Sequence, residues 1–180
     1  AGVAVAFLTN DIFNLCVAFE ILLRASYALT VAGGGRERLR AGVAYVTLNL
    51  VGSAIFLIGL ALFYGAVGTL NMADAAVALA ALPAENLPLA RLALTLILLV
   101  FLLKAALAPM CFWLPHVYAA ATAPAAILFA IMTKVGVYAL LRVCALILPA
   151  SPATATLTAP WLGWLAIAPI AAGVLGALAA

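Results

Sequence analysis

Three ionisable side chains interrupt long apolar runs of this sequence and could carry proton-transfer chemistry. Glu20 and Lys134 each lie near the middle of such a run, and Lys104 lies in a third run, five residues before Pro109. In a helix that rises about 1.5 Å per residue, these positions fall close to the middle of a bilayer core about 30 Å thick. A charge at that depth costs at least about 2.5–3.5 kcal/mol, so such groups usually face a bundle interior or a water path.

Two interpretations of these residues are open. Glu20 and one lysine could form a passive ion pair that only fixes helix packing. Buried pairs of this kind are often no more stable than an apolar replacement. One acid set against two lysines is also hard to explain by packing alone. The pattern therefore favours a proton relay through Glu20, Lys104 and Lys134.

Pro109 and Pro115 indicate that the helix carrying Lys104 is broken. A proline inside a helix lacks the N–H donor, and its ring clashes with the preceding turn. A broken helix frees backbone carbonyls near Ala105 and can hold a hydrated, movable lysine. An ordinary proline kink is the alternative for this segment.

Arg24 and His116 are further candidates, for the path by which protons reach the relay. Arg24 follows Glu20 by four residues. It could pair with Glu20 along the helix, or extend its charge toward the cytoplasmic end of the span. His116 lies in a Trp-Leu-Pro-His-Val-Tyr turn. A histidine can change charge near neutral pH, which suits proton uptake, although a lone loop histidine more often has no such role.

The composition excludes most other kinds of site. Of the 180 residues, 70% are apolar and only 7% charged, with a net charge of +3 and a mean hydropathy of +1.36. Soluble domains carry about 25% charged residues, so lipid or other membrane helices must surround most of these side chains. The three cysteines lack metal-ligand spacing, and the sequence has no phosphate loop or nucleotide fingerprint. We therefore expect neither a metal nor a cofactor.

The arginines of residues 36–40 form the only cluster of positive charge. This cluster is too short for a nucleic-acid surface, so no nucleic-acid partner is expected. A glycine run at residues 33–35 should end the preceding helix, and residues 36–40 are predicted to form a charged turn on the cytoplasmic side. The loop at residues 69–88 carries acids and no lysine or arginine, so it is expected outside.

Five apolar stretches are long enough to cross a membrane as helices, whose backbone polar groups are satisfied internally. Their predicted limits are residues 11–31, 41–65, 89–109, 124–148 and 161–179.

Shorter elements are predicted between these spans. Residues 1–8 should be the end of a preceding helix, with Asp11 capping the next one. A short surface helix is predicted at residues 72–81, and residues 151–160 are interpreted as a linker. The predicted fold is all-α, a polytopic transmembrane helix bundle with about five membrane spans and one broken helix. The chain starts without Met and stops inside an apolar run, so a fragment of a longer protein is expected.

Six strings distributed along nearly the whole chain resemble one family as a set. They are LTNDIFNL at residues 8–15, FEILL at 19–23, TLNMAD at 69–74, LKAALAP at 103–109, FWLP at 112–115 and TKVGVYALLR at 133–142. Together they resemble the D subunit of Mrp/Pha-type multisubunit monovalent cation/proton antiporters. That protein is homologous to the antiporter-like subunits of respiratory complex I and of membrane hydrogenases.

The resemblance implies roles for the same residues. In the family, the acid matching Glu20 pairs with the lysine matching Lys104 on a broken seventh helix, and the lysine matching Lys134 on the eighth helix relays protons onward. Residues 1–180 would form part of one proton-translocating domain, from the end of the fourth helix through the ninth.

The resemblance also implies a setting. The implied partners are other membrane subunits, protons with Na⁺ or K⁺, and the lipid bilayer, in the cell membrane of a prokaryote. The alternative is a non-catalytic, proton-pumping subunit of an NADH:quinone oxidoreductase or of a membrane hydrogenase.

Overall fold

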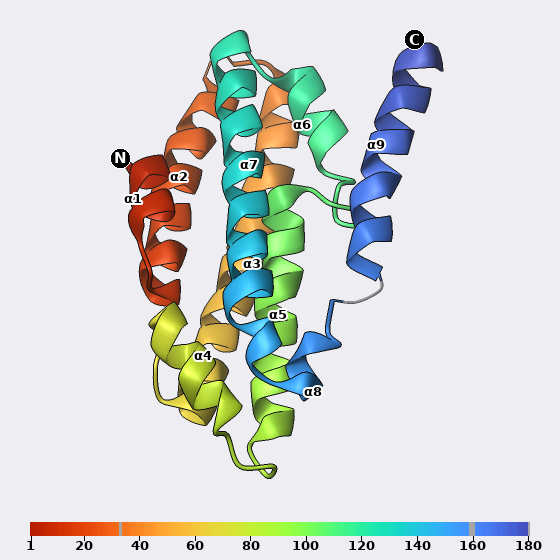
Figure 1. Cartoon of the computed structure of the whole chain (residues 1–180). Helices are drawn as coiled ribbons and strands as arrows, with labels where there is room; N and C mark the ends of the chain where they lie inside the picture. The colour runs from red at the N-terminus through yellow and green to blue at the C-terminus, as the bar shows by residue number, and fades with distance from the viewer. Residues whose placement is uncertain (33, 159–160, 180) are drawn as a thin grey trace.

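A computed structural model describes residues 1–32, 34–158 and 161–179 as a set of helices (Figure 1). The helices are α1 (Gly2–Leu8), α2 (Ile12–Val31), α3 (Arg36–Val67), α4 (Met72–Ala80), α5 (Leu87–Ala105), α6 (Leu114–Ala120), α7 (Ala123–Leu146), the 3-10 helix η1 (Leu148–Ala150), α8 (Pro152–Ala155) and α9 (Trp161–Ala179). The predicted all-α class is therefore confirmed.

Four of these helices are long and apolar enough to cross a membrane. They begin at Ile12, Arg36, Leu87 and Ala123. The fifth predicted stretch forms α9, whose apolar segment Trp161–Leu175 is shorter than the four spanning helices. In Figure 1, α9 stands at the edge of the bundle, and most of its described side chains are exposed.

Local signals explain where α2 and α3 begin. As predicted, Asp11 caps α2, because its carboxylate accepts a hydrogen bond of 2.9 Å from the backbone N–H of Asn14. The predicted charged turn at residues 36–40 is wrong, since these residues form the first turns of α3. Gly34 and Gly35, at φ of 69° and 100°, already provide the break. Arginine, glutamate and leucine then favour a helix. Gly33 lies outside the described residues.

The predicted short helix after α3 is present as α4, and it belongs to the bundle. Asn71 caps it, and Met72, Ala75 and Leu79 are buried. A short antiparallel bridge ties its start to the start of α2: Ile12 N–H donates to the Leu70 carbonyl at 2.9 Å. The helix is therefore present as predicted, but it is less exposed than a surface helix would be.

The predicted linker at residues 151–160 is more ordered than expected. Residues 152–155 form α8, in which Thr154 is buried and donates to the Leu148 carbonyl at 2.8 Å. Ala159 and Pro160 lie outside the described residues.

The core forms around α5, which packs against α3 on one side and α7 on the other (Figure 1). Its buried residues run from Ala90 to its last residue, Ala105. Aromatic rings fill the space between helices: Phe101 of α5 lies 5.2 Å from Phe56 of α3 and 6.0 Å from Phe19 of α2, centroid to centroid. This packing fixes the end of α5 inside the bundle.

Candidate functional site

The break in the helix that carries Lys104 is present, and it begins earlier than the prolines suggest. α5 ends at Ala105, and Ala106 adopts a left-handed conformation with φ 52°. The N–H of Ala106 donates to the Leu103 carbonyl at 3.2 Å, and the N–H of Leu107 donates to the Leu102 carbonyl at 3.0 Å. These bonds satisfy carbonyls that a helix end would otherwise leave free.

The two prolines have different places in this break. Pro109 lies in the segment between α5 and α6, where a helix has already ended. Pro115 lies in the first turn of α6, where a missing N–H is tolerated. Trp113 links the segment after the break back to α5, because its indole N–H donates to the Leu103 carbonyl at 3.3 Å.

Lys104 is buried in the last turn of α5, with 5% of its surface exposed. Its Nζ donates to Oδ1 of Asn49 at 3.0 Å. Asn49 is itself buried near the middle of α3, and its Nδ2 donates to the Tyr45 carbonyl at 2.9 Å. The amide of Asn49 is therefore oriented so that its oxygen faces the ammonium.

Glu20 reaches the same face of α3 from α2. It is half-buried, and its Oε1 accepts a hydrogen bond from the hydroxyl of Ser53. Ser53 lies four residues after Asn49, which is about one helical turn. We refer to these two residues of α3 as the Asn49/Ser53 pair. The family resemblance implies that Glu20 pairs with Lys104. In this structure Glu20 is hydrogen-bonded to Ser53, and Lys104 is hydrogen-bonded to Asn49.

Gly52 allows α5 to come this close to α3. A Cβ atom at Gly52 would lie 2.9 Å from Cδ2 of Leu103 and 4.0 Å from Nζ of Lys104. A larger residue would therefore press on the leucine that precedes the buried lysine.

Gly136 of α7 makes a still closer contact, with the backbone at the end of α5. A Cβ atom at Gly136 would lie 2.5 Å from the nitrogen of Ala105 and 2.6 Å from the carbonyl carbon of Lys104. Since backbone atoms cannot move aside by changing rotamer, only glycine fits here. α7 is thus held directly against the residue that carries the buried ammonium.

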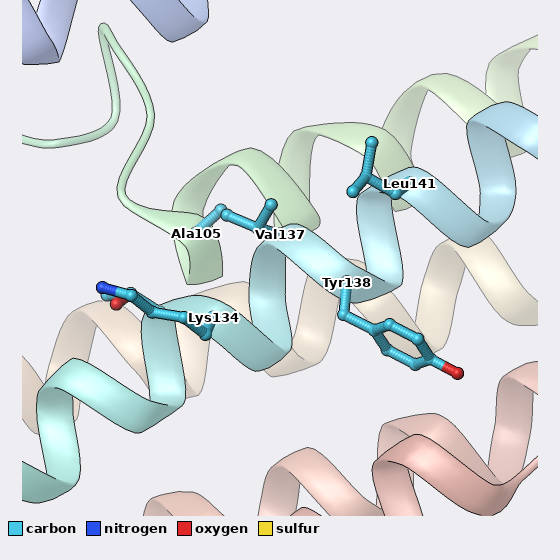
Figure 2. A pocket seen from close by; sticks show the side chains of 6 residues that line it. Ala105, Lys134, Val137, Tyr138 and Leu141 are labelled. Carbon is cyan, nitrogen blue, oxygen red and sulfur yellow. The ribbon is translucent and has the colours of Figure 1, made fainter.

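Lys134 lies near the middle of α7, two residues before this contact, and its side chain is exposed. It borders an open hollow of about 400 Å³ (Figure 2), whose other lining residues are Ala105, Thr133, Val137, Tyr138 and Leu141. In Figure 2 the side chains of Lys134 and Tyr138 point in different directions from α7. Because Ala105 follows Lys104 directly, this hollow begins one residue from the buried lysine.

Arg24 and His116 lie at the periphery. Arg24 is exposed on α2, one turn beyond Glu20, and His116 is exposed on α6. The predicted turn around His116 is therefore a short helix. The end of α6 is tied to the start of α3, because Nε of Arg38 donates to the Ala120 carbonyl at 2.9 Å.

Three residues of this site were not predicted as such. They are Asn49, Ser53 and Gly136, for which the sequence alone predicted no role in the site. The sequence contains one usable signal, since Asn49 and Ser53 are polar residues four apart within an apolar run. Among the described residues, no three His, Cys, Asp or Glu side chains gather so that they could hold a metal ion.

The sequence of this chain matches one family over most of its length. The sequence model described as NADH:quinone oxidoreductase/Mrp antiporter, TM matches residues 9–180. The probable D subunit of a K⁺/H⁺ antiporter of Rhizobium meliloti is 47% identical over 180 residues, which cover 99% of this chain and 33% of the relative. The D subunit of a Na⁺/H⁺ antiporter of Bacillus subtilis is 44% identical over 180 residues, 99% of this chain and 36% of the relative. The chain thus spans about a third of these relatives.

Solved structures give the same result. A chain of the membrane-bound sulfane sulfur reductase, an archaeal respiratory membrane complex, superposes with a TM-score of 0.76 at 36% identity, over 87% of this chain and 32% of that chain. A chain of the Mrp complex from Dietzia sp. DQ12-45-1b superposes with a TM-score of 0.69 at 35% identity, over 81% of this chain and 27% of that chain.

Proposed function

The chain belongs to the membrane-protein family of NADH:quinone oxidoreductase and Mrp antiporter subunits, and we propose that it is the proton-translocating part of a subunit of a multisubunit Na⁺/H⁺ or K⁺/H⁺ antiporter. It is a multi-pass protein of a prokaryotic plasma membrane. Its curated relatives are named as D subunits of antiporters, which supports the choice of this branch.

One observation carries the proposal. An acid from α2 and an amine from α5, Glu20 and Lys104, meet the same polar turn of α3 in the middle of an apolar bundle. Lys104 is almost completely buried there. Ionisable groups at membrane depth are costly and are found mainly where ions or protons move. A passive ion pair would place the two charges directly against each other, whereas here neutral side chains occupy the space beside each charge.

The distance between Glu20 and Lys104 then becomes the variable that controls proton affinity. At about 4 Å and an effective dielectric constant near 20, a carboxylate stabilises an ammonium by roughly 4 kcal/mol. Doubling the separation removes about 2 kcal/mol, which is roughly a thirtyfold change in proton affinity. A small shift of α5 against α2 could thus make Lys104 take up or release a proton.

Lys134 is the proposed next group in the relay. The contact of Gly136 with the backbone of Lys104 and Ala105 couples the end of α5 to α7. A movement of Lys104 together with the end of α5 would therefore displace α7 at Gly136, two residues from Lys134. Arg24 and His116, both exposed, are proposed on the path that connects the relay with solvent.

The proposed partners are other membrane subunits, lipid, protons and Na⁺ or K⁺. Large apolar side chains are exposed along the spanning helices, among them Val43 and Ile58 on α3 and Leu141 on α7. Such surfaces need lipid or further membrane helices against them.

Cation-dependent dissipation of a pH gradient in vesicles that carry the full assembly tests the proposal. Glu20→Gln and Lys104→Ala should each abolish most of the exchange. Glu85→Gln is the matched control for the acid, since Glu85 is exposed in the loop before α5. Exchange at the wild-type rate in both relay variants would refute the proposal.

A second candidate is the non-catalytic, proton-pumping subunit of an NADH:quinone oxidoreductase or a membrane hydrogenase. The observation in its favour is the structural similarity to a chain of an archaeal respiratory complex. The same vesicles discriminate between the two. An antiporter exchanges a cation for protons in the absence of an electron donor, whereas a respiratory subunit moves protons only while a donor is oxidised.

A further inference from the structure

The side chain of Asn49 is oriented to accept a hydrogen bond from an ammonium group. It is buried with 4% of its surface exposed, and its oxygen accepts from Nζ of Lys104 at 3.0 Å. Its Nδ2 is already used, because it donates to the Tyr45 carbonyl one turn earlier on the same helix. The amide therefore cannot rotate without losing that bond, and it presents an acceptor to Lys104.

Ser53 is the counterpart of Asn49 for the acid. Its hydroxyl donates to the carboxylate of Glu20. A single turn of α3 thus offers an acceptor to the amine and a donor to the acid, each suited to the charge that it meets. Both partners are neutral, so they satisfy the charges without cancelling them.

We propose that Asn49 is a positioning residue that holds Lys104 away from Glu20, and that exchange of the ammonium between Asn49 and Glu20 sets the pH range of transport. This inference rests on the proposed function and adds a resting state to it. With Lys104 on Asn49 the two charges stay separate. With Lys104 released, the amine can approach the acid.

Asn49 and Glu20 stabilise the ammonium of Lys104 by similar amounts. A hydrogen bond to a charged group changes an equilibrium by roughly ten- to a hundredfold. Halving the distance between the amine and the acid changes the proton affinity by a similar factor, roughly thirtyfold. Neither partner therefore holds the lysine permanently, which a repeated transport cycle requires.

Other groups face Lys104 from the helices around it. Glu20 and Cys16 of α2 lie close enough to act on its charge. Tyr45 of α3 and Lys104 both line a small hollow of about 10 Å³. α7 brings Lys134 to the hollow beyond Ala105, and α8 carries no titratable side chain. Of the neutral groups, Asn49 alone is hydrogen-bonded to the ammonium in the described part of the chain.

The test is the pH profile of cation-dependent exchange by the full-length subunit in its assembled complex. Asn49→Leu removes one of two partners of similar strength, and Glu20 still stabilises the protonated lysine, so the alkaline limit of transport should move down by less than about 1 pH unit. Asn49→Asp keeps the size of the side chain and adds a negative charge beside the ammonium, so the limit should move up. Thr47→Val, an exposed position on α3, should leave the profile unchanged.

Opposite shifts in the two Asn49 variants support the inference, since a purely structural role would not reverse the sign. A wild-type profile in Asn49→Asp would overturn it, even if Asn49→Leu failed to assemble. Lys104→Ala is measured in parallel. If it loses exchange while the Asn49 variants keep the wild-type profile, only the positioning role fails; if it keeps exchange, the proposed function itself fails.

Discussion

Gly136→Ala would place a methyl group where the backbone of α5 already lies. The new Cβ would be 2.5 Å from the nitrogen of Ala105, 2.6 Å from the carbonyl carbon of Lys104 and 2.8 Å from the Cα of Ala105. Overpacking of a tight interior costs about 1–3 kcal/mol, and a clash with backbone belongs at the upper end of that range. The higher helix propensity of alanine returns about 1 kcal/mol. The expected net loss is about 2 kcal/mol.

This loss should be visible in two measurements. The assembled complex should melt at a lower temperature, and its exchange rate should fall, because relief of the clash moves the end of α5 and the lysine on it. Gly65→Ala is the matched control: this glycine lies within α3, and a Cβ there would meet nothing within 4 Å. If Gly136→Ala melted and exchanged cations as Gly65→Ala does, the inferred contact between α5 and α7 would be refuted.

Two further predictions concern the end of the bundle where α1 meets α2. Asp11→Ala removes the cap of α2 and should lower stability by about 1 kcal/mol, seen as earlier thermal unfolding; equal melting curves would contradict it. Arg142→Gln weakens the two 2.6 Å hydrogen bonds from α7 to the Thr9 carbonyl and the Asn10 side chain. The part-buried bond to Thr9 is worth about 1.5–3 kcal/mol and the exposed bond to Asn10 less, so proteases should cut the turn at residues 9–10 faster in this variant. Unchanged cleavage would count against this role of Arg142.

Features that depend on neighbouring residues in the sequence could be predicted. Asp11 before an apolar run marked the start of α2, and the apolar stretches themselves located the four spanning helices. The prolines around Lys104 indicated a broken helix, although the break begins at Ala106. The arginines of residues 36–40 misled the prediction, because their charge suggested a turn while their helix propensity favoured a helix.

Features that depend on packing could not be predicted in the same way. The burial of Lys104 and its bond to Asn49 join residues 55 positions apart. The need for glycine at position 136 arises only from the approach of α5. The depth of a residue in the membrane could be predicted by counting along its helix. The neighbours of each helix, however, are decided by contacts between segments that are distant in the sequence. For that reason the charges of Glu20 and Lys104 were anticipated, and their neutral partners on α3 were not.

The coupling of Glu20 and Lys104 through α3 is tested most directly by the exchange rates of Glu20→Gln, Lys104→Gln and the double variant, measured in vesicles with the same amount of assembled complex. If the acid and the amine work as one unit through α3, each single variant loses most of the activity, and the double variant is no slower than the slower single one. Wild-type rates in the single variants, or losses that multiply in the double variant, would contradict a coupled pair.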